Sequence, residues 1–231
     1  MFCSCGRRVQ LFKFLKESLG DSCKIIATDV QSIAPALYAA DEHYLTPCID
    51  APNYVDTILK IAIDNDVKAI TTLIDPEIEL LAKNRDLFEE HGIIVLAPSK
   101  ETAAYCFDKY KMFCYLKKNN IRTVLTYDTL EHFKEGYNKH EISFPVFIKP
   151  RTGSGSVGIH KCSNMNELEN YFSEGKFDYI IQEFMDCEDC DADVYIDCYS
   201  HKPVAAFYKN KLETKIGGAS KTISFKNQKL F

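Results

Sequence analysis

The pattern of apolar residues changes once along this chain of 231 residues, and that change constrains the fold more than any other feature. Up to about residue 98, short apolar runs alternate with stretches of helical periodicity. Beyond that point most apolar runs are strand-like and closely spaced. Alternation is typical of a parallel sheet covered on both faces, whereas closely spaced strands favour an antiparallel α+β unit. The sequence therefore predicts two architectures that join near Ala97-Pro98-Ser99.

The first region, residues 1–98, is predicted to be a Rossmann-like α/β domain. Strands are expected over 2–5, 24–27, 69–73 and 93–96, and helices over 9–19, 54–63 and 75–90. Asp75-Pro-Glu77 fits a helix entry with Asp75 as the N-cap. Ligands of such folds bind at the carboxyl edge of the sheet. Arg7 and Arg8 follow the first strand there, so they either help to hold a carboxylate substrate or lie solvated at a helix start.

The second region, residues 99–231, is predicted to be an α+β domain with a small lobe to about residue 182 and the start of a large lobe after it. Helices are expected near 99–105 and 109–119, and one clear helix near 165–172 interrupts strands over 144–149, 158–161, 179–182, 193–199 and 204–209. The last segment, Thr222–Phe225, has the composition of a strand start, and we expect its strand partners to be missing.

The densest chemical signal lies where the apolar strand over 144–149 ends in Lys149. The loop that follows contains glycines at 153, 155 and 158, and a second strand then returns. Glycines let backbone N–H groups approach a polyphosphate closely, and a lysine fixed on a strand adds a positive charge. In the Walker pattern the lysine instead follows the glycines and a helix begins. We therefore predict a flap over a phosphate chain, with a flexible hairpin and a solvated lysine as the alternative.

Three weaker signals accompany this loop. Asp108-Lys109 opens a helix and offers a second cation. The apolar strand over 179–182 runs into Gln182–Met185, a segment whose backbone and apolar side chains suit an adenine ring. The acidic run that begins at Asp186 offers acceptors for ribose hydroxyls. Taken singly, each has an ordinary explanation as a solvated charge, a strand end or an acidic turn.

Together these residues resemble the ATP-grasp superfamily. Within it, Gly6–Leu11, Ala34–Leu37 and Leu73–Glu77 are similar to the carbamoyl-phosphate-synthase-like branch. The resemblance covers essentially the whole chain. It implies a Rossmann-like pre-ATP-grasp domain followed by an ATP-grasp domain, and an ATP-dependent carboxylate–amine ligase that acts through an acyl phosphate with ATP and Mg²⁺.

The resemblance also implies roles in holding phosphate. Lys109 and Lys149 would contact the α- and β-phosphates, and Lys209 or Lys211 would meet the γ-phosphate or the acyl phosphate. The mobile flap would consist of Thr152, Gly153, Ser154, Gly155, Ser156 and Val157.

The nucleoside would be held by the segment after the third strand of this domain. Adenine would be bracketed by Gln182, Glu183, Phe184 and Met185, largely through backbone atoms. Asp189 aligns best with the ribose-binding acid of the family, which is usually a glutamate, and Glu188 is its rival. Cys187 stands where relatives often have glycine.

The sequence departs from the family in one respect. The magnesium ligands, an acid and a later Glu-x-Asn element, should follow Gly217-Gly218, and no Glu-x-Asn occurs before Phe231. We therefore expect metal ligands only beyond Phe231 and a large lobe that is truncated. The chain is then expected to bind ATP weakly or not at all, to turn over nothing, and to self-associate as a homodimer through exposed apolar surface.

Bulk properties exclude several other classes. A formal net charge of -5 argues against nucleic acid, and no apolar run is long enough to span a membrane. Without an export signal the ten cysteines are expected to be reduced thiols in the cytoplasm. Two alternatives stay open: a nucleotide sensor without chemistry, and an NAD-dependent oxidoreductase suggested by Asp29 after the second strand. The lack of a GxGxxG motif argues against the latter.

Overall fold

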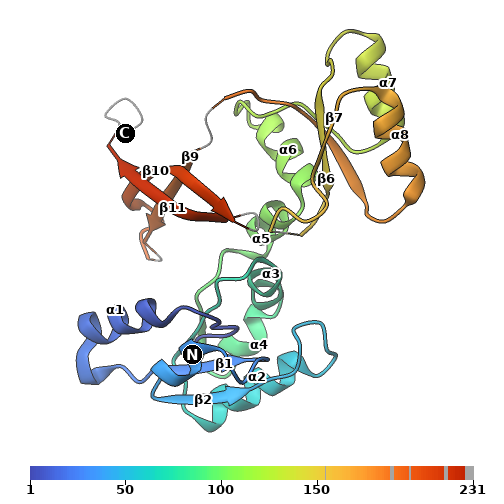
Figure 1. The fold of residues 1–231 in the computed structure, drawn as a ribbon. Coiled ribbons are helices and arrows are strands. Elements are labelled where there is room, and N and C mark those ends of the chain that lie inside the picture. Colours follow the sequence, from blue (N-terminus) through green and yellow to red (C-terminus); the bar gives the residue numbers. More distant parts are fainter. Residues whose placement is uncertain (154, 188–189, 198, 216–217, 227–231) are drawn as a thin grey trace. The chain divides into compact units, whose positions relative to one another are not determined.

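The computed structural model describes residues 1–153, 155–187, 190–197, 199–215 and 218–226. The chain divides into two compact units, Met1–Lys111 and Met112–Phe231, and each is described by itself (Figure 1). The predicted domain boundary after residue 98 stays a prediction.

Unit 1 is built on a parallel sheet whose first strand passes through Phe2. β1 (Ile26–Asp29) pairs with β2 (Glu42–Leu45), and β3 (Ala69–Ile70) pairs with β4 (Ile94–Val95). Phe2 forms parallel bridges to both Ala27 and Thr71, so the first segment joins the two pairs. The spatial order is therefore β2, β1, first segment, β3, β4. This is the doubly wound order, and the sequence prediction of a Rossmann-like domain is confirmed.

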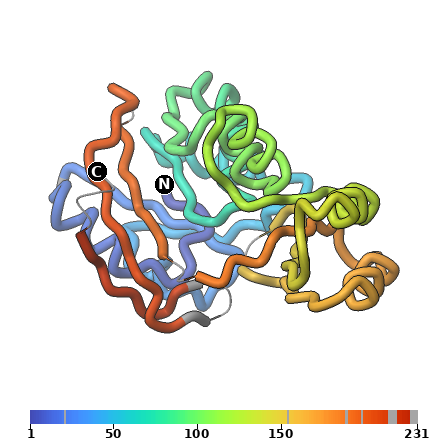
Figure 2. Tube along the Cα trace, turned by 90° about the horizontal axis from the view of Figure 1, so that it is seen from above, coloured from blue at the N-terminus to red at the C-terminus, as the bar shows by residue number. Residues whose placement is uncertain are grey.

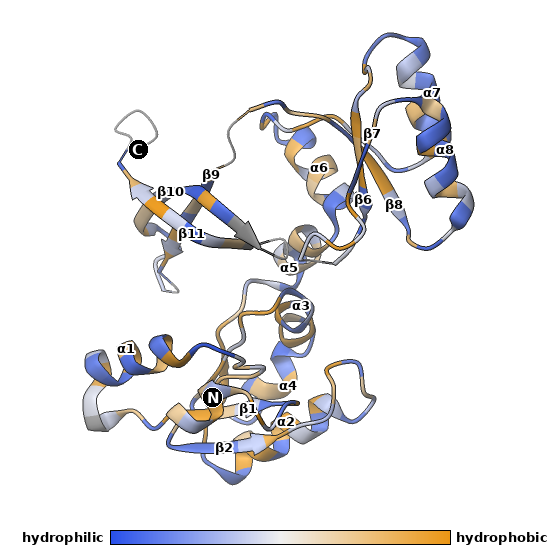
Figure 3. Cartoon of the chain, viewed as in Figure 1, coloured by the Kyte–Doolittle hydropathy of each residue, from blue (hydrophilic) through white to orange (hydrophobic). Residues whose placement is uncertain are grey.

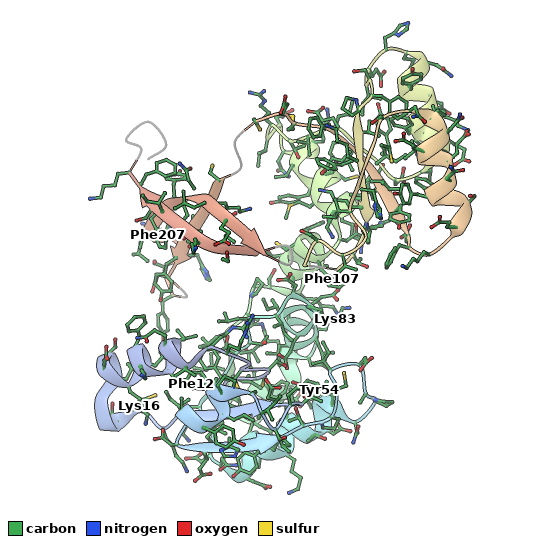
Figure 4. The ribbon with its side chains drawn as sticks, viewed as in Figure 1. Phe12, Lys16, Tyr54, Lys83, Phe107 and Phe207 are labelled. Carbon is green, nitrogen blue, oxygen red and sulfur yellow. The ribbon has the colours of Figure 1, made fainter. Side chains whose placement is uncertain are left out.

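Both faces of this sheet are covered, which explains why β1 is buried at every position. One face carries α1 (Val9–Leu19) and the 3-10 helix η2 (Pro35–Ala39), and a second 3-10 helix, η1 (Gly20–Ser22), follows α1. The other face carries α2 (Tyr54–Asp64), α3 (Asp75–Lys83) and α4 (Arg85–Glu89). Phe12 of α1 and Tyr54 of α2, both labelled in Figure 4, are fully buried in these two cores.

Three details of unit 1 differ from the sequence prediction. The helix expected over 75–90 is broken, because α3 ends at Lys83 and α4 begins at Arg85. Asp75 is not the N-cap; it lies inside the first turn of α3, after Ile74. Strand β2 was not predicted, since its exposed edge position leaves only alternate residues half-buried.

Two helices follow β4. α5 (Lys100–Phe107) begins at Ser99, whose Oγ accepts a hydrogen bond of 3.1 Å from the Thr102 N–H, and it packs against α3. α6 (Lys109–Lys118) begins after Asp108, whose Oδ1 accepts bonds of 3.0 Å from the N–H groups of Tyr110 and Lys111. Both helices were predicted, and these caps explain where they begin.

Unit 2 contains a four-stranded antiparallel sheet in the order β5, β8, β6, β7. Its strands are β5 (Thr126–Tyr127), β6 (Val146–Pro150), β7 (His160–Cys162) and β8 (Tyr179–Glu183). α7 (Leu130–Asn138) and α8 (Met165–Glu174) lie side by side against one face (Figures 1 and 2). Phe133 of α7 and Leu168 of α8 pack in one core with the strands, whose apolar residues are orange in Figure 3.

The helix predicted near 165–172 is α8, whereas α7, which precedes β6, was not predicted. Its Gly136 approaches Tyr127 so closely that an added Cβ would lie 2.1 Å from the Tyr127 hydroxyl. A glycine inside the helix lowers its intrinsic helix propensity, which weakens the sequence signal. Packing against Tyr127 requires it nonetheless.

A three-stranded antiparallel sheet completes unit 2, in the order β11, β10, β9. Its strands are β9 (Cys190–Ile196), β10 (Pro203–Lys215) and β11 (Gly218–Phe225). The expectation that Thr222–Phe225 lacks partners was wrong, since β11 pairs with β10 along its length. Several large apolar side chains of this sheet are exposed, including Val194, Leu212 and Ile223. Self-association through them stays a prediction.

Candidate functional site: a lysine, a glycine-rich loop and a hinge on one sheet

Lys149 lies on the face of the four-stranded sheet that points away from α7 and α8. Val146 and Ile148 of β6 are fully buried in the core beneath those helices. Successive side chains of a strand point to opposite faces, so Phe147 and Lys149 share the other face. Lys149 pairs in register with Ile180 of β8, at the end of the strand where the loop begins. The strand thus fixes the backbone of Lys149, and the role of its ammonium group toward phosphate stays a prediction.

The glycine-rich loop has positive φ at four of its described residues. φ is +99° at Gly153, +75° at Gly155, +57° at Ser156 and +73° at Gly158. Glycine-rich turns of this kind let backbone N–H groups come close to an anion. A Cβ on Gly158 would lie 3.0 Å from side-chain atoms of Pro150 and Phe177, so only glycine fits at the base of the loop. Thr152 and Val157 belong to the same loop; Ser154 lies outside the described residues.

The predicted adenine hinge lies where β8 ends. The side-chain amide nitrogen of Gln182 donates a 2.9 Å bond to Thr126 Oγ1 on β5, which orients that amide. The N–H of Glu183 donates to the Leu125 carbonyl at 2.9 Å, so this amide is not available to adenine. Phe184 is half-buried and Met185 is exposed. Asp189 and Glu188, the predicted ribose acids, lie outside the described residues.

Lys109 belongs to unit 1 and is the first residue of α6. Burial lowers the pKa of its ammonium group, and the nearby carboxylates of Asp75 and Asp108 oppose that shift. Lys149 lies in unit 2, so the joint use of the two lysines on one nucleotide stays a prediction.

Lys209 and Lys211 share one face of the three-stranded sheet, because they are two residues apart on β10. Each forms an ion pair with an aspartate of β9: Lys209 Nζ lies 2.6 Å from Asp193, and Lys211 Nζ lies 3.1 Å from Asp191. These pairs fix two cations side by side. Their predicted role toward a γ-phosphate is not tested by the geometry.

The two adjacent arginines of unit 1 occupy different environments. Arg8 donates to the carbonyl oxygens of Ser4, Cys5 and Leu73 at 3.1, 3.4 and 3.2 Å. It therefore ties the loop after the first strand to the loop after β3, across the switch point of the sheet. Arg7 is exposed beside it. Arg8 has a structural function in this loop, and of the predicted pair Arg7 is the better placed to meet a substrate.

The carboxylate of Asp29, which suggested an NAD-binding alternative, accepts hydrogen bonds from the protein's own backbone. Its two carboxylate oxygens accept bonds of 2.8 Å from the backbone N–H groups of Gly6 and Gln31. A ribose diol would need those same oxygens, so the geometry argues against dinucleotide binding here.

Several residues of this region carried no recognisable sequence signal. Thr126 orients Gln182 from a two-residue strand, which is too short to show a period. Lys161 of β7 places its ammonium 3.8 Å from the centre of the Phe184 ring. Within the described part of the chain, no three acidic, histidine or cysteine side chains gather as a metal site requires, and no helix has the length and hydropathy of a membrane span.

Two family models match the chain. The PylC-like N-terminal domain matches residues 1–96, and the D-ala D-ala ligase C-terminus matches residues 116–203. The small subunit of 2-oxoglutarate carboxylase from Hydrogenobacter thermophilus is 26% identical over 186 residues, which cover 74% of this chain and 39% of that protein. D-alanine–D-alanine ligase B from Clostridium perfringens is 36% identical over 90 residues, covering 36% of this chain and 29% of that protein.

Solved structures agree in fold. The biotin carboxylase domain of the Hydrogenobacter thermophilus 2-oxoglutarate carboxylase, solved with MgADP, ADP and bicarbonate, superposes with a TM-score of 0.70 at 20% identity. That match covers 94% of this chain and 51% of the solved chain. N5-carboxyaminoimidazole synthetase from Staphylococcus aureus gives a TM-score of 0.71 at 13% identity, covering 96% and 56%. The chain thus spans about half the length of these solved relatives.

A doubly wound unit followed by an antiparallel sheet with a lysine and a glycine-rich loop at one strand end defines the class as the ATP-grasp fold. The two family models cover the two units of that fold in order. The chain belongs to the ATP-grasp superfamily.

Proposed function

We propose that this chain is the nucleotide-binding part of an ATP-dependent carboxylate–amine ligase. The observation that carries the proposal is the placement of Lys149 on a rigid strand, directly before a loop with four positive-φ residues and on the same face as Phe147 and Gln182. Such a surface offers a cation, backbone N–H groups and apolar area to one elongated anion.

The residues present fit ATP. Lys149 supplies charge for the phosphates, the loop over 152–158 supplies N–H groups, and Gln182 presents an amide whose orientation Thr126 fixes. Magnesium is proposed to enter with the nucleotide. Because the described residues form no acidic cluster, none of them is assigned as its ligand. Lys109, Lys209 and Lys211 are proposed as further phosphate contacts.

The proposed chemistry is an acyl-phosphate ligation. An oxygen of the substrate carboxylate attacks the γ-phosphorus, the bond to the β–γ bridging oxygen breaks, and ADP leaves. The amine then attacks the acyl carbon, phosphate leaves, and the amine loses a proton. Catalysis of this kind depends on position and charge neutralisation, which fixed lysines and a closing loop supply.

Two finer assignments belong to the same proposal. Gly6–Leu11, Ala34–Leu37 and Leu73–Glu77 support the carbamoyl-phosphate-synthase-like branch. Arg7, exposed after the first strand of unit 1, is proposed to meet a small carboxylate at the carboxyl edge of the sheet.

The experiment that tests the proposal is calorimetric titration of ATP into the wild type and Lys149→Ala. Loss of one charge-assisted phosphate contact should weaken binding by roughly 1.5–3 kcal/mol, about 10- to 150-fold in Kd. ATP is taken to millimolar concentration, since the sequence predicts weak binding.

Lys134→Ala is the matched control. Lys134 lies on α7, in the layer that covers the opposite face of the same sheet, and pairs with Glu169 of α8 at 2.5 Å. Its loss should leave the Kd unchanged. Equal affinity of the wild type and Lys149→Ala would remove Lys149 from the site and with it the proposal.

A further inference from the structure

Lys161, Phe147 and Gln182 form a row across the four-stranded sheet of unit 2. The row runs from the strand after the glycine-rich loop to the strand before the predicted adenine hinge. Phe147 of β6 pairs in register with Lys161 of β7 on one side and with Gln182 of β8 on the other. The ring centres of Phe147 and Phe184 lie 5.2 Å apart. Lys161 Nζ lies 3.8 Å from the centre of the Phe184 ring. The Phe184 ring thus makes an aromatic contact with Phe147 and a cation–π contact with Lys161.

Lys161 and Phe184 both lie next to segments of the proposed ATP site. β7 is an edge strand and follows the glycine-rich loop directly. Phe184 is the first residue beyond β8, and the residues after it, Met185 and Asp186, are exposed. Phe184 is therefore the last side chain of the hinge that the sheet anchors. Lys161 is exposed, yet its ammonium group lies over this ring.

We propose that Lys161 is a positioning residue that sets the preference for adenine by holding Phe184 against Phe147. The role rests on the proposed ATP site, and it acts through the hinge backbone over 183–185 rather than on the phosphates. Removal of Lys161 should therefore change the discrimination between nucleotide bases, whereas the affinity for the phosphate chain should stay unchanged.

The variants are Lys161→Met, Lys161→Arg, Phe184→Leu and the double variant Lys161→Met/Phe184→Leu. The probes are ATP, GTP and inorganic tripolyphosphate, each titrated by calorimetry. Lys161→Met should weaken ATP about two- to fivefold, the range of an exposed cation–π contact, and lower the ATP-to-GTP preference. Tripolyphosphate affinity should stay at the wild-type value.

Two further measurements separate positioning from other roles. Lys161→Arg should restore ATP affinity, because a guanidinium also stacks on an aromatic face. In the Phe184→Leu background Lys161→Met should have no added effect, since the ring through which it acts is gone. Lys176→Met is the matched control, because Lys176 lies 5.5 Å from the Phe177 ring in the same unit and should leave all three affinities unchanged.

The proposal fails if Lys161→Met weakens tripolyphosphate as much as ATP, which would make Lys161 a direct phosphate contact. It also fails if the effects of Lys161→Met and Phe184→Leu on ATP affinity are additive in the double variant. In both cases wild-type ATP binding that depends on Lys149 would leave the proposed function standing. A wild type that binds no ATP would overturn the proposed function and this role together.

Discussion

The sheets of the two units differ in how their polar residues are used. The parallel sheet of unit 1 has cores on both faces, and the polar groups at its carboxyl edge bond to the protein itself. Asp29 accepts from Gly6 and Gln31, and Arg8 donates to three carbonyls. The four-stranded sheet of unit 2 has its core cluster on one face. Its second face carries the half-buried side chains of Phe147, Lys149 and Gln182, which are the residues proposed to bind ATP. The comparison therefore favours unit 2 as the place where a nucleotide would bind, as proposed above.

The largest expected effect concerns Glu77, a fully buried carboxyl of unit 1. It is 0% exposed and accepts hydrogen bonds from the hydroxyls of Tyr54 and Thr72. Glu77→Ala leaves two buried hydroxyls without their acceptor, so unit 1 should lose roughly 3 kcal/mol of stability. Hydrogen exchange read by mass spectrometry, peptide by peptide, assigns the loss to unit 1, where a two-state fit of the whole chain would not.

Two controls decide whether burial is the cause. Glu79→Ala, on the same helix, removes an ion pair of 2.9 Å with Lys83 and should cost under about 0.5 kcal/mol. Lys149→Ala in unit 2 should change stability by about 0.5 kcal/mol at most while it weakens ATP. A stability loss for Lys149→Ala equal to that for Glu77→Ala would break the contrast between the units.

The sequence predicted the order of elements where they are long and periodic. The alternation over 1–98 gave the doubly wound unit, and the apolar strand before Lys149 gave β6. It missed β2 and β5 because an edge strand and a two-residue strand bury too little to show a period. It missed α7 because Gly136 lowers helix propensity at a position that tertiary packing dictates.

The site was predictable only where it is local in sequence. Lys149 and the glycines stand next to one another, so their joint role shows in the chain. Arg8 bonds to the Leu73 carbonyl, 65 residues away, and Lys161 meets Phe184 across an intervening strand. Such contacts depend on strand order, which a single sequence does not contain.

The next largest effect on stability compares two adjacent arginines in the loop after the first strand of unit 1. Arg8→Met removes hydrogen bonds to the carbonyls of Ser4, Cys5 and Leu73 and should destabilise unit 1 by about 1–2 kcal/mol. Arg7→Met should stay within about 0.5 kcal/mol, because Arg7 is exposed. Hydrogen exchange of the peptides around the first strand and Leu73 measures both. Equal losses for the two variants would mean that Arg7 is structural as well, and so poorly suited to a substrate.

The smallest expected effect tests whether exposed ion pairs of unit 1 contribute to its stability. Lys16 contacts Asp41, and the Ile25 N–H donates to the same carboxylate at 2.6 Å. The Lys16 hydrogen bond, followed by that backbone bond, lowers the pKa of Asp41. A lowered carboxyl pKa contributes stability that is fully present above the unfolded value, roughly pH 4, and is lost as the pH falls through the folded value. Because both side chains are more than a third exposed, solvent screening should limit the gain to about 0.5 kcal/mol.

Asp41→Asn should therefore be slightly less stable than the wild type at pH 7, and the difference should close as the pH falls through the lowered pKa of Asp41. Thermal unfolding across this range measures it, and 1 M salt should shrink the pH 7 difference, because exposed pairs are screened. Asp64→Asn, which removes a more exposed pair with Lys60, should show a smaller difference still. Equal stability of the two proteins at every pH would assign the role of Asp41 to its hydrogen bond with the Ile25 N–H, since asparagine keeps that acceptor but not the charge. Unit 1 would then be held together at its rim, as at its carboxyl edge, by backbone-directed bonds rather than by charge.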